Sequence, residues 1–267
     1  MTEQARLVLD GVADLAYVVP GYTAKQFPDV AVMELPGIFN DEREASLVFA
    51  RLIKAGALEG YRKFFVVGAF VTIGENIDSR KPIARLSDLK GQTIRVNNSI
   101  TGSAIRVLGA APTLLAVNRT MDALSQGKID GVTVPPSLLF EFGFGRLTAH
   151  HYMLKFGGAP ISLVMNREKF ASLAPPAQEI IRRYSGDWLS ERGAACFEAK
   201  NRETVAQLKA DRRRTVVEPS PADLATARRV FASVVEEWAA KSPHNRELLE
   251  LVRAEIAKLR SSKETRP

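Results

Sequence analysis

One arginine of this sequence is placed where it could bind an organic acid. Arg95 lies in a short β-prone run, residues 92–96, in which Ile94 and Val96 share one strand face and Arg95 and Asn97 share the other. A guanidinium directed into a cleft can hold a carboxylate through two parallel hydrogen bonds. On this pattern alone, an arginine on the solvated face of a strand is the simpler interpretation, so carboxylate binding needs further support.

Asn98 follows the same strand and has two possible roles. A helix is expected over residues 99–108, and its free N–H groups could face an anion together with the Asn98 amide. An asparagine at this position can equally bond to its own backbone and form the turn. The sequence leaves both roles open.

Two segments more than a hundred residues apart share one pattern. Residues 11–20 (GVADLAYVVP) and 127–136 (GKIDGVTVPP) each begin with a glycine, carry an aspartate three residues later, and run through a β-prone stretch into Val-Pro. In each, a helix ends on glycine, a strand follows, and proline ends the strand at the carboxyl edge, where open α/β sheets bind ligands. Asp14 and Asp130 are expected to brace these turns. The repetition predicts two lobes facing each other across a cleft. The alternative is chance, because a helix, a glycine, a strand and a proline often follow one another in this order.

The elements around these segments indicate an α/β protein. Short strands alternate with helices up to about residue 167, which is typical of largely parallel sheets. Residues 29–36 are expected to be extended. The remainder is mostly helical, with one strand over residues 214–219 and helices beginning after Ser220 and Ser242, each followed by proline.

Composition excludes several classes of protein. The 267 residues carry a net charge of +7, and the densest basic run, residues 212–214, is interpreted as a solvated turn rather than a nucleic-acid site. The single cysteine, Cys196, excludes an intramolecular disulfide and is expected to be a small core residue. The longest apolar stretch, residues 64–74, is too short to span a bilayer, and no export signal opens the chain.

Five blocks in consecutive order carry a family resemblance. They are residues 9–36 (LDGVADLAYVVPGYTAKQFPDVAVMELP), 86–96 (LSDLKGQTIRV), 108–117 (LGAAPTLLAV), 123–132 (ALSQGKIDGV) and 163–173 (LVMNREKFASL). This ordered set resembles the solute-binding subunits of TRAP (tripartite ATP-independent periplasmic) transporters of the dicarboxylate-binding type, from about residue 3 to about residue 213.

The resemblance implies a two-lobed α/β fold of the type II periplasmic-binding-protein kind, with hinge strands and a long bracing helix. Residues 1–71 and 185–219 are expected to form lobe I, and residues 72–184 and 220–267 lobe II. It also implies a periplasmic, monomeric receptor that binds a small organic acid without a cofactor or a reaction and delivers it to a membrane permease. Family chains carry an export signal and a strand–helix–strand unit before the first helix seen here, so lobe I is expected to be truncated, and a misplaced start is the favoured explanation.

The resemblance also carries residues of a binding site onto this sequence. Arg95 matches the arginine of the family motif in residues 86–96 and is expected to hold the ligand carboxylate. Asn98 matches a polar position of the family beside it. The full expected set is Arg95, Asn97, Asn98, Tyr17, Tyr22, Pro135, Phe156 and Gly158, with no metal.

Several polar positions of the family are absent here. A second basic residue is often found before SRKPI, where this chain reads VTIGENIDS, and Thr133, Val134 and Pro135 replace a more polar trio. Fewer polar partners predict a monocarboxylate with an apolar or aromatic body, because unpaired buried donors would be costly. Phe140, Phe142 and Phe144, with Tyr17 and Tyr22, could form apolar walls, although core packing explains each phenylalanine equally well.

Other functions lack the residues they need. His150 and His151 point to opposite sides of a strand and cannot easily share a metal ion. An effector-sensing domain of a transcription regulator shares the two-lobed fold but would need a helix-turn-helix at one end. A small α/β enzyme acting on acids would need a titratable pair in the cleft, and Arg95 has no such companion nearby in sequence.

Overall fold

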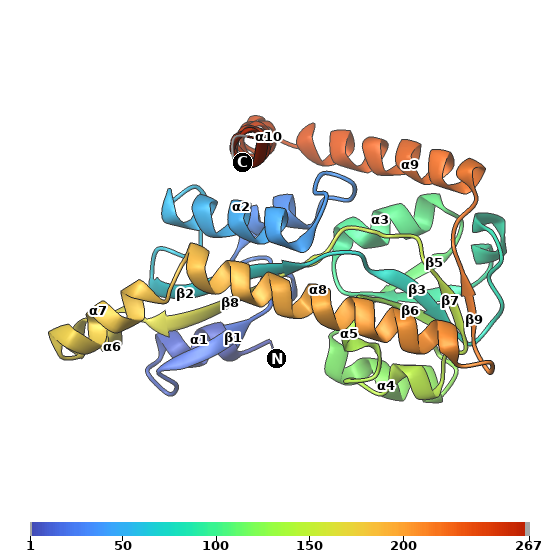
Figure 1. The fold of residues 1–267 in the computed structure, drawn as a ribbon, viewed down its shortest axis with the longest axis horizontal. Coiled ribbons are helices and arrows are strands. Elements are labelled where there is room, and N and C mark those ends of the chain that lie inside the picture. The colour runs from blue at the N-terminus through green and yellow to red at the C-terminus, as the bar shows by residue number, and fades with distance from the viewer. Residues whose placement is uncertain (1, 265–267) are drawn as a thin grey trace.

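Two β-sheets form the centres of two lobes, which lie side by side in Figure 1. The structure is a computed structural model that describes residues 2–264. The first sheet has the order β1-β8-β2, and β8 runs antiparallel to both neighbours. The second has the order β5-β4-β6-β3-β7-β9. The strands are β1 (Leu15–Val18), β2 (Phe64–Thr72), β3 (Asn76–Ser79), β4 (Thr93–Val96), β5 (Ala111–Leu114), β6 (Gly131–Val134), β7 (His150–Tyr152), β8 (Ala159–Asn166) and β9 (Thr215–Val217).

The expectation of largely parallel sheets holds for only part of the molecule. Strand β4 is parallel to β5 and β6, and β7 is parallel to β9. The hinge strand β3 is antiparallel to both of its neighbours. The chain enters the second lobe through β3, and β3 alone runs against the shared direction of the other five strands of this sheet.

The helices cover the two sheets and join them. They are α1 (Gln4–Leu9), η1 (Pro20–Thr23), η2 (Pro28–Glu34), α2 (Glu42–Lys54), η3 (Leu86–Leu89), α3 (Ser99–Val107), α4 (Val117–Ser125), α5 (Pro136–Leu139), η4 (Phe144–Arg146), α6 (Arg167–Ser172), α7 (Pro175–Arg183), α8 (Asp187–Ala210), α9 (Pro221–Ala239) and α10 (Pro243–Glu264). Residues 29–36, expected to be extended, are instead mostly the 3₁₀ helix η2, which begins at Pro28 and buries Val32 and Met33 in the core.

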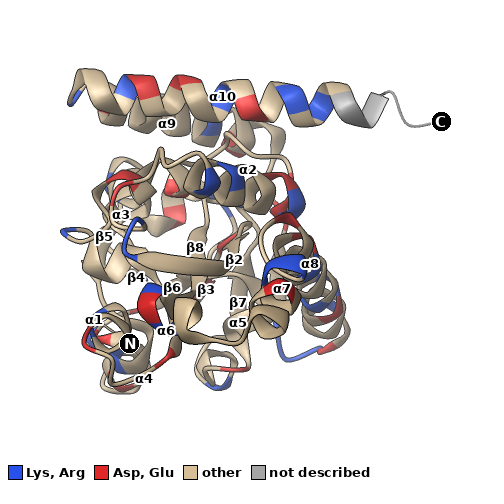
Figure 2. Ribbon diagram, turned by 90° about the vertical axis from the view of Figure 1, so that its left-hand side faces the viewer, with Lys and Arg blue, Asp and Glu red and all other residues tan. Residues whose placement is uncertain are grey.

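The long helix α8 braces both lobes, as the resemblance implied. It packs against α2 and β2 in the first lobe and against α5 and β9 in the second. Helix α9 packs on α3, whereas α10 packs on α2 and η2, and Figure 2 shows α9 and α10 as a layer above α2 and α3. Cys196, expected in the core, is exposed on α8.

The expected lobe boundaries need correction at three places. Residues 159–183 were assigned to lobe II, but β8 lies between β1 and β2 in the first sheet, and α6 packs on β8 and β2. Residues 215–217 were assigned to lobe I, but β9 pairs with β7 in the second sheet. Helix α10, assigned to lobe II, packs on lobe I elements, while residues 265–267 lie outside the described part. The sequence-based division placed the return to lobe I at residue 185, whereas the chain already returns to the first sheet with β8, after β7.

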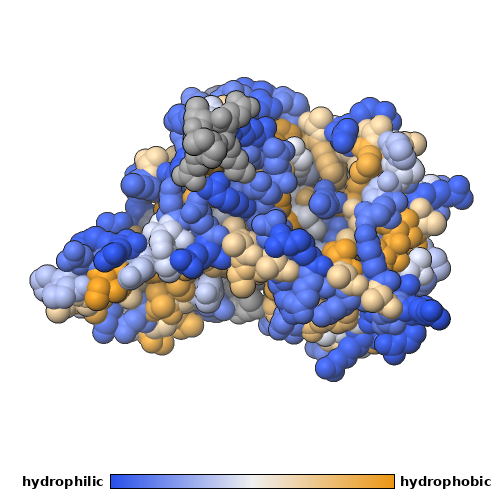
Figure 3. Space-filling model, viewed as in Figure 1, coloured by the Kyte–Doolittle hydropathy of each residue, from blue (hydrophilic) through white to orange (hydrophobic). Residues whose placement is uncertain are grey.

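Two hydrophobic clusters stabilise the fold. The larger runs through both lobes, from β2, α2 and η2 to β4, α3, α9 and α10. The smaller lies under α4, α5 and α8 in the second lobe. Hydrophilic side chains cover most of the face drawn in Figure 3, and apolar residues lie there in small separate groups. Among residues 2–264, no helix combines the length and apolar character needed to cross a membrane.

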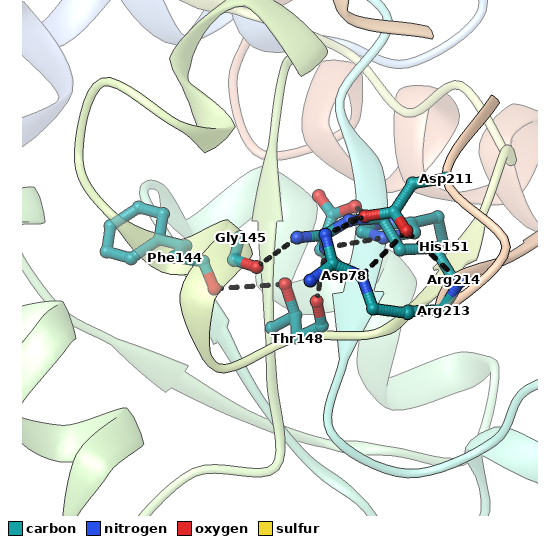
Figure 4. Close-up of polar contacts among 8 residues, drawn as sticks. All are labelled: Asp78, Phe144, Gly145, Thr148, His151, Asp211, Arg213 and Arg214. Atoms are coloured by element: carbon teal, nitrogen blue, oxygen red, sulfur yellow. Dashed lines mark hydrogen bonds and ion pairs between the residues drawn. The ribbon is translucent and has the colours of Figure 1, made fainter. Parts of the chain in front are cut away.

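A buried polar cluster ties β3, β7 and the turn before β9 together (Figure 4). His151 Nδ1 lies 2.6 Å from Asp78 Oδ1, and His151 Nε2 lies 3.4 Å from a guanidinium nitrogen of Arg214. This geometry fits a tautomer in which Nδ1–H donates to the carboxylate and Nε2 accepts from Arg214. Arg214 also donates to the backbone oxygens of Thr148 and Gly145 at 2.8 Å and 2.7 Å. His151 is therefore a structural residue of the second lobe.

We expect Arg214→Lys to destabilise the protein by about 1–3 kcal/mol, because a single ammonium cannot serve both backbone oxygens and the histidine and leaves buried acceptors unpaired. Denaturant unfolding followed by circular dichroism measures this. The matched control is Arg213→Lys: Arg213 binds the same Asp211, yet its side chain is 88% exposed, so a change within about 0.5 kcal/mol is expected. Equal effects of the two substitutions would contradict this role of Arg214.

Candidate functional site

Arg95 is buried at the junction of the two lobes. It lies in β4, between β5 and β6, with only 2% of its surface exposed. Its Nε donates to the backbone oxygen of Leu115 at 2.9 Å, and Nη1 donates to the backbone oxygen of Thr133 at 3.2 Å. Nη2 donates to the Tyr22 hydroxyl at 3.1 Å. A guanidinium has five N–H groups, so one N–H on each terminal nitrogen lies outside these three bonds. Both groups lie in the guanidinium plane, and a carboxylate can bind two N–H groups of one guanidinium.

Tyr22 brings the first lobe to this arginine. It lies in η1, directly after the first of the two repeated segments, and its hydroxyl also accepts a hydrogen bond from the Val117 amide at 3.2 Å. Thr133, whose oxygen binds Arg95, belongs to β6 in the second repeated segment. The two Val-Pro strand ends therefore meet at Arg95, one from each lobe, which explains why the chain carries the same pattern twice.

The repeated aspartates differ in how they act. Asp130 Oδ2 accepts from the Thr93 amide at 2.8 Å, and Oδ1 lies 2.7 Å from Lys81 Nζ, so this carboxylate braces the start of β4 as expected. Asp14 forms an exposed ion pair with Lys169 on α6 at 3.3 Å. Its backbone oxygen accepts from Asn166, which places its turn against the end of β8.

Asn97 and Asn98, directly after β4, form a chain of hydrogen bonds to a buried acid. Asn98 Oδ1 accepts from the Thr101 amide at 2.7 Å and caps α3, so the turn-forming role is present. Its Nδ2 donates to Asn97 Oδ1 at 3.0 Å, and Asn97 Nδ2 donates in turn to Glu75 Oε1 at 2.7 Å. Glu75 is 1% exposed and lies in the hinge between β2 and β3. The amides are thus oriented by one another and by the helix they begin.

A second buried acid, Glu34, comes from the first lobe. It ends η2 and is 4% exposed. A Cβ atom at Gly21 would lie 2.5 Å from Glu34 Oε1 and 3.7 Å from Asn98 Cβ, which places this carboxyl group between the lobes. Burial, reinforced by the charge of Glu75, raises the pKa of Glu34 to about 8. Burial raises the pKa of Glu75 to about 7, although the Arg95 charge and hydrogen bonding by the Asn97 and Thr133 side chains act against it.

The other expected site residues lie at different distances from this cluster. Tyr17 on β1 is 60% exposed, and its ring lies 6.1 Å from that of Phe70 rather than among the contacts of Arg95. Pro135 is buried where β6 ends and α5 begins. Phe156 is buried at the hinge. Its amide donates to the backbone oxygen of Glu75, and its ring centroid lies 5.5 Å from that of Phe231. These positions remain predictions for ligand contact.

Gly158 is explained by the hinge itself. A Cβ atom there would collide with the backbone oxygen of Thr72 and lie 3.0 Å from Ile73, so only glycine lets the two hinge segments approach this closely. We expect Gly158→Ala to lower the free energy of unfolding by about 1–3 kcal/mol, measured by denaturant titration. Gly102→Ala is the control: its Cβ would lie 3.5 Å or more from other atoms within α3, so no loss is expected. A neutral Gly158→Ala would contradict the close packing of the hinge.

The phenylalanines proposed as apolar walls take other roles. Phe144 is fully buried in the smaller hydrophobic cluster and stacks with Phe142 at 5.8 Å. Phe140 is 40% exposed, and Arg214 lies over its ring at 5.2 Å. Of the two alternatives left open by the sequence, Phe144 follows core packing, and Gly143 directly before it has a φ of 75°.

Sequence reasoning missed the two acids. Glu75 stands in VTIGENIDS, the stretch in which a second basic residue was expected, and Glu34 lies within the first family block. A charged residue inside an otherwise apolar hinge was the only available signal. For metal binding, the part of the chain that is described contains no cluster of three His, Cys, Asp or Glu side chains suited to an ion.

Comparison with known proteins identifies the family. The model for bacterial extracellular solute-binding protein, family 7, matches residues 2–242, and the chain belongs to this family. A TRAP solute-binding protein from Rhodoferax ferrireducens T118, solved in complex with copurified benzoate, is 25% identical with a TM-score of 0.92, covering 98% of this chain and 84% of that one. The two-lobed fold is therefore that of TRAP solute-binding proteins.

Two further similar proteins are also solute-binding proteins. A marine metagenome TRAP solute-binding protein specific for aromatic acid ligands shares the fold, with a TM-score of 0.89 at 23% identity over 96% of this chain and 83% of that one. A solute-binding protein of Sulfitobacter sp. strain NAS-14.1 is 26% identical over 203 residues, or 74% of this chain. The chain spans 56% and 60% of the length of the first two curated relatives it matches.

Proposed function

We propose that this protein is the periplasmic solute receptor of a TRAP transporter. Arg95 carries the proposal: it is buried at the junction of the lobes, and each of its terminal nitrogens keeps one N–H group outside the three hydrogen bonds to the protein. A carboxylate placed there would receive a bidentate, charge-assisted pair of bonds. The partner is a membrane permease to which the loaded receptor delivers its ligand.

The proposed ligand is a small monocarboxylate with an aromatic body. Family members of the same fold were solved with benzoate and with mandelate. The site in this chain has one buried guanidinium and, in place of a second basic residue, the acid Glu75. A second carboxylate on the ligand would therefore meet a buried acid rather than a cation, which disfavours dicarboxylates.

Binding is expected to close the lobes about the segments 73–75 and 153–158. Isothermal titration calorimetry with benzoate, mandelate, succinate and malate tests the ligand class, and small-angle scattering with and without the tightest acid tests closure. We expect an aryl acid to bind best, to raise the melting temperature reversibly and to reduce the radius of gyration. Succinate or malate binding far more tightly than either aryl acid would contradict the ligand class.

Glu34 and Glu75 are the titratable pair that an enzyme acting on acids would require. The same samples therefore include recovery of the acid by mass spectrometry after prolonged incubation. A receptor returns the acid unchanged, and formation of product would replace the receptor proposal with the enzyme.

A further inference from the structure

Glu75 presents a buried hydrogen-bond acceptor with no partner. Its Oε1 is occupied by Asn97 Nδ2 at 2.7 Å, and within the described residues its Oε2 is buried without a hydrogen bond. The Thr133 side chain also acts on this carboxyl group, but its hydroxyl donates to the Arg95 backbone oxygen at 3.3 Å. Asn97 is itself fixed by Asn98, whose side chain caps α3. The carboxyl group of Glu75 is therefore held in one orientation, and the cost of its unpaired oxygen is present in the empty protein.

The acceptor has a defined place relative to Arg95. Arg95 lies in β4 and Asn97 directly follows this strand, two residues on, so with extended backbone their side chains would emerge about 6.6 Å from each other, twice the rise of a strand. Asn97 holds Glu75 directly, and the Arg95 charge acts on the Glu75 carboxyl group. A ligand anchored by its carboxylate on Arg95 needs a body on the scale of one six-membered ring to reach Glu75.

A hydroxyl group fits this acceptor better than an ammonium group. The neighbours of Glu75 already include the cation Arg95 and the second acid Glu34. A hydroxyl can donate to one carboxyl group and accept from the other when that group is protonated, and it adds no charge to a buried site. An ammonium would add a second desolvated cation beside Arg95.

We propose that Glu75, supported by Glu34, accepts a hydrogen bond from a hydroxyl group on the ligand while Arg95 holds its carboxylate, so that the cleft selects hydroxylated aromatic acids over their unsubstituted analogues. This inference rests on the proposed function. It adds one polar contact to the monocarboxylate with an aromatic body that the sequence predicts.

Calorimetric titration with four acids of one series tests the inference. Benzoate has no hydroxyl, 3-hydroxybenzoate and 4-hydroxybenzoate place it at two positions, and 3-methoxybenzoate keeps the oxygen without the donor. We expect the better hydroxybenzoate to bind about 10- to 100-fold more tightly than both benzoate and 3-methoxybenzoate. Equal affinity for all four acids overturns the inference and leaves the receptor proposal standing, whereas binding of none of them contradicts the proposed ligand class itself.

Two variants assign the preference to Glu75. Glu75→Met keeps the size and removes both acceptors, and the ratio of benzoate to hydroxybenzoate dissociation constants is expected to fall to about 1. If circular dichroism shows that Glu75→Met does not fold, Glu75→Gln takes its place. Its amide oxygen can still accept from Asn97, while an NH₂ group replaces Oε2. The affinity for 3-methoxybenzoate should then rise relative to that for 3-hydroxybenzoate. Glu141→Gln, at an exposed position, is the control and should keep the wild-type ratio. A wild-type ratio in the folded Glu75 variants overturns the inference.

Discussion

Arg95→Ala is expected to weaken binding of the cognate carboxylate by about 30- to 4,000-fold. The estimate follows from the 2–5 kcal/mol lost when one partner of a buried, hydrogen-bonded charge pair is removed, at about 1.4 kcal/mol per factor of ten. Calorimetric titration of the variant with the acid that binds the wild type most tightly measures it. The loss should be in the dissociation rate more than in the association rate, because the contact forms only after the ligand is desolvated.

The fold must be monitored in the same experiment. Arg95 also donates to the backbone oxygens of Leu115 and Thr133, so its removal unpairs buried acceptors and lowers stability as well. Arg95→Lys keeps the charge but not the planar fork, and should retain the fold better while still losing most affinity. Arg106→Lys, on the exposed face of α3, is the matched control. Wild-type affinity in a folded Arg95→Ala protein would remove Arg95 from the site.

The ligand-free protein is expected to lose stability as the pH rises from about 5 to about 8. The pKa of Glu34 is raised to about 8 and that of Glu75 to about 7, so between these values and the ordinary glutamate pKa the folded state holds protons that the unfolded state has released. The stabilisation is fully present below the unfolded pKa and is lost as the pH rises through the folded pKa. Each group can contribute up to about 1.4 kcal/mol per pH unit in that window.

Thermal unfolding at half-unit pH intervals measures this dependence. A fall of several degrees in melting temperature is expected across the window, since about 2–4 °C corresponds to 1 kcal/mol in a protein of this size. Glu34→Gln removes one of these groups and should reduce the slope, while Glu42 and Asp78, whose pKa values burial also raises, continue to contribute. The pKa of Asp88 is lowered by hydrogen bonds from the backbone amides of Ala84 and Arg85, so its contribution is complete before the window begins. A melting temperature of the wild type that rises from pH 5 to pH 8 would contradict the burial of protonated carboxyl groups at the lobe junction.

Features set by local chemistry were predictable from the sequence. The alternation in residues 92–96 placed Arg95 and Asn97 on one face, and the glycine and Val-Pro positions of the two repeated segments marked strands whose ends meet at Arg95. The proline after Ser220 marked the start of α9 in the same way. Each of these signals depends on residues within one turn or strand of one another.

Features set by long-range packing were not predictable. Glu34 and Glu75 are 41 positions apart, and their proximity depends on how η2 lies against the hinge. The lobe boundaries failed because β8 inserts between β1 and β2, a pairing that no local pattern encodes. Phe144 follows a strand-like spacing, but it lies in the 3₁₀ helix η4 and packs in the smaller hydrophobic cluster.

The split attachment of the last two helices has a mechanical consequence. Helix α9 is fixed to α3 in one lobe and α10 to α2 and η2 in the other, with only residues 240–242 between them. Any rotation of the lobes must therefore be absorbed in that three-residue joint as well as in the strands, which makes the helical pair a strut that limits the opening angle. Lengthening the joint with glycines should widen the range of angles that the empty receptor samples.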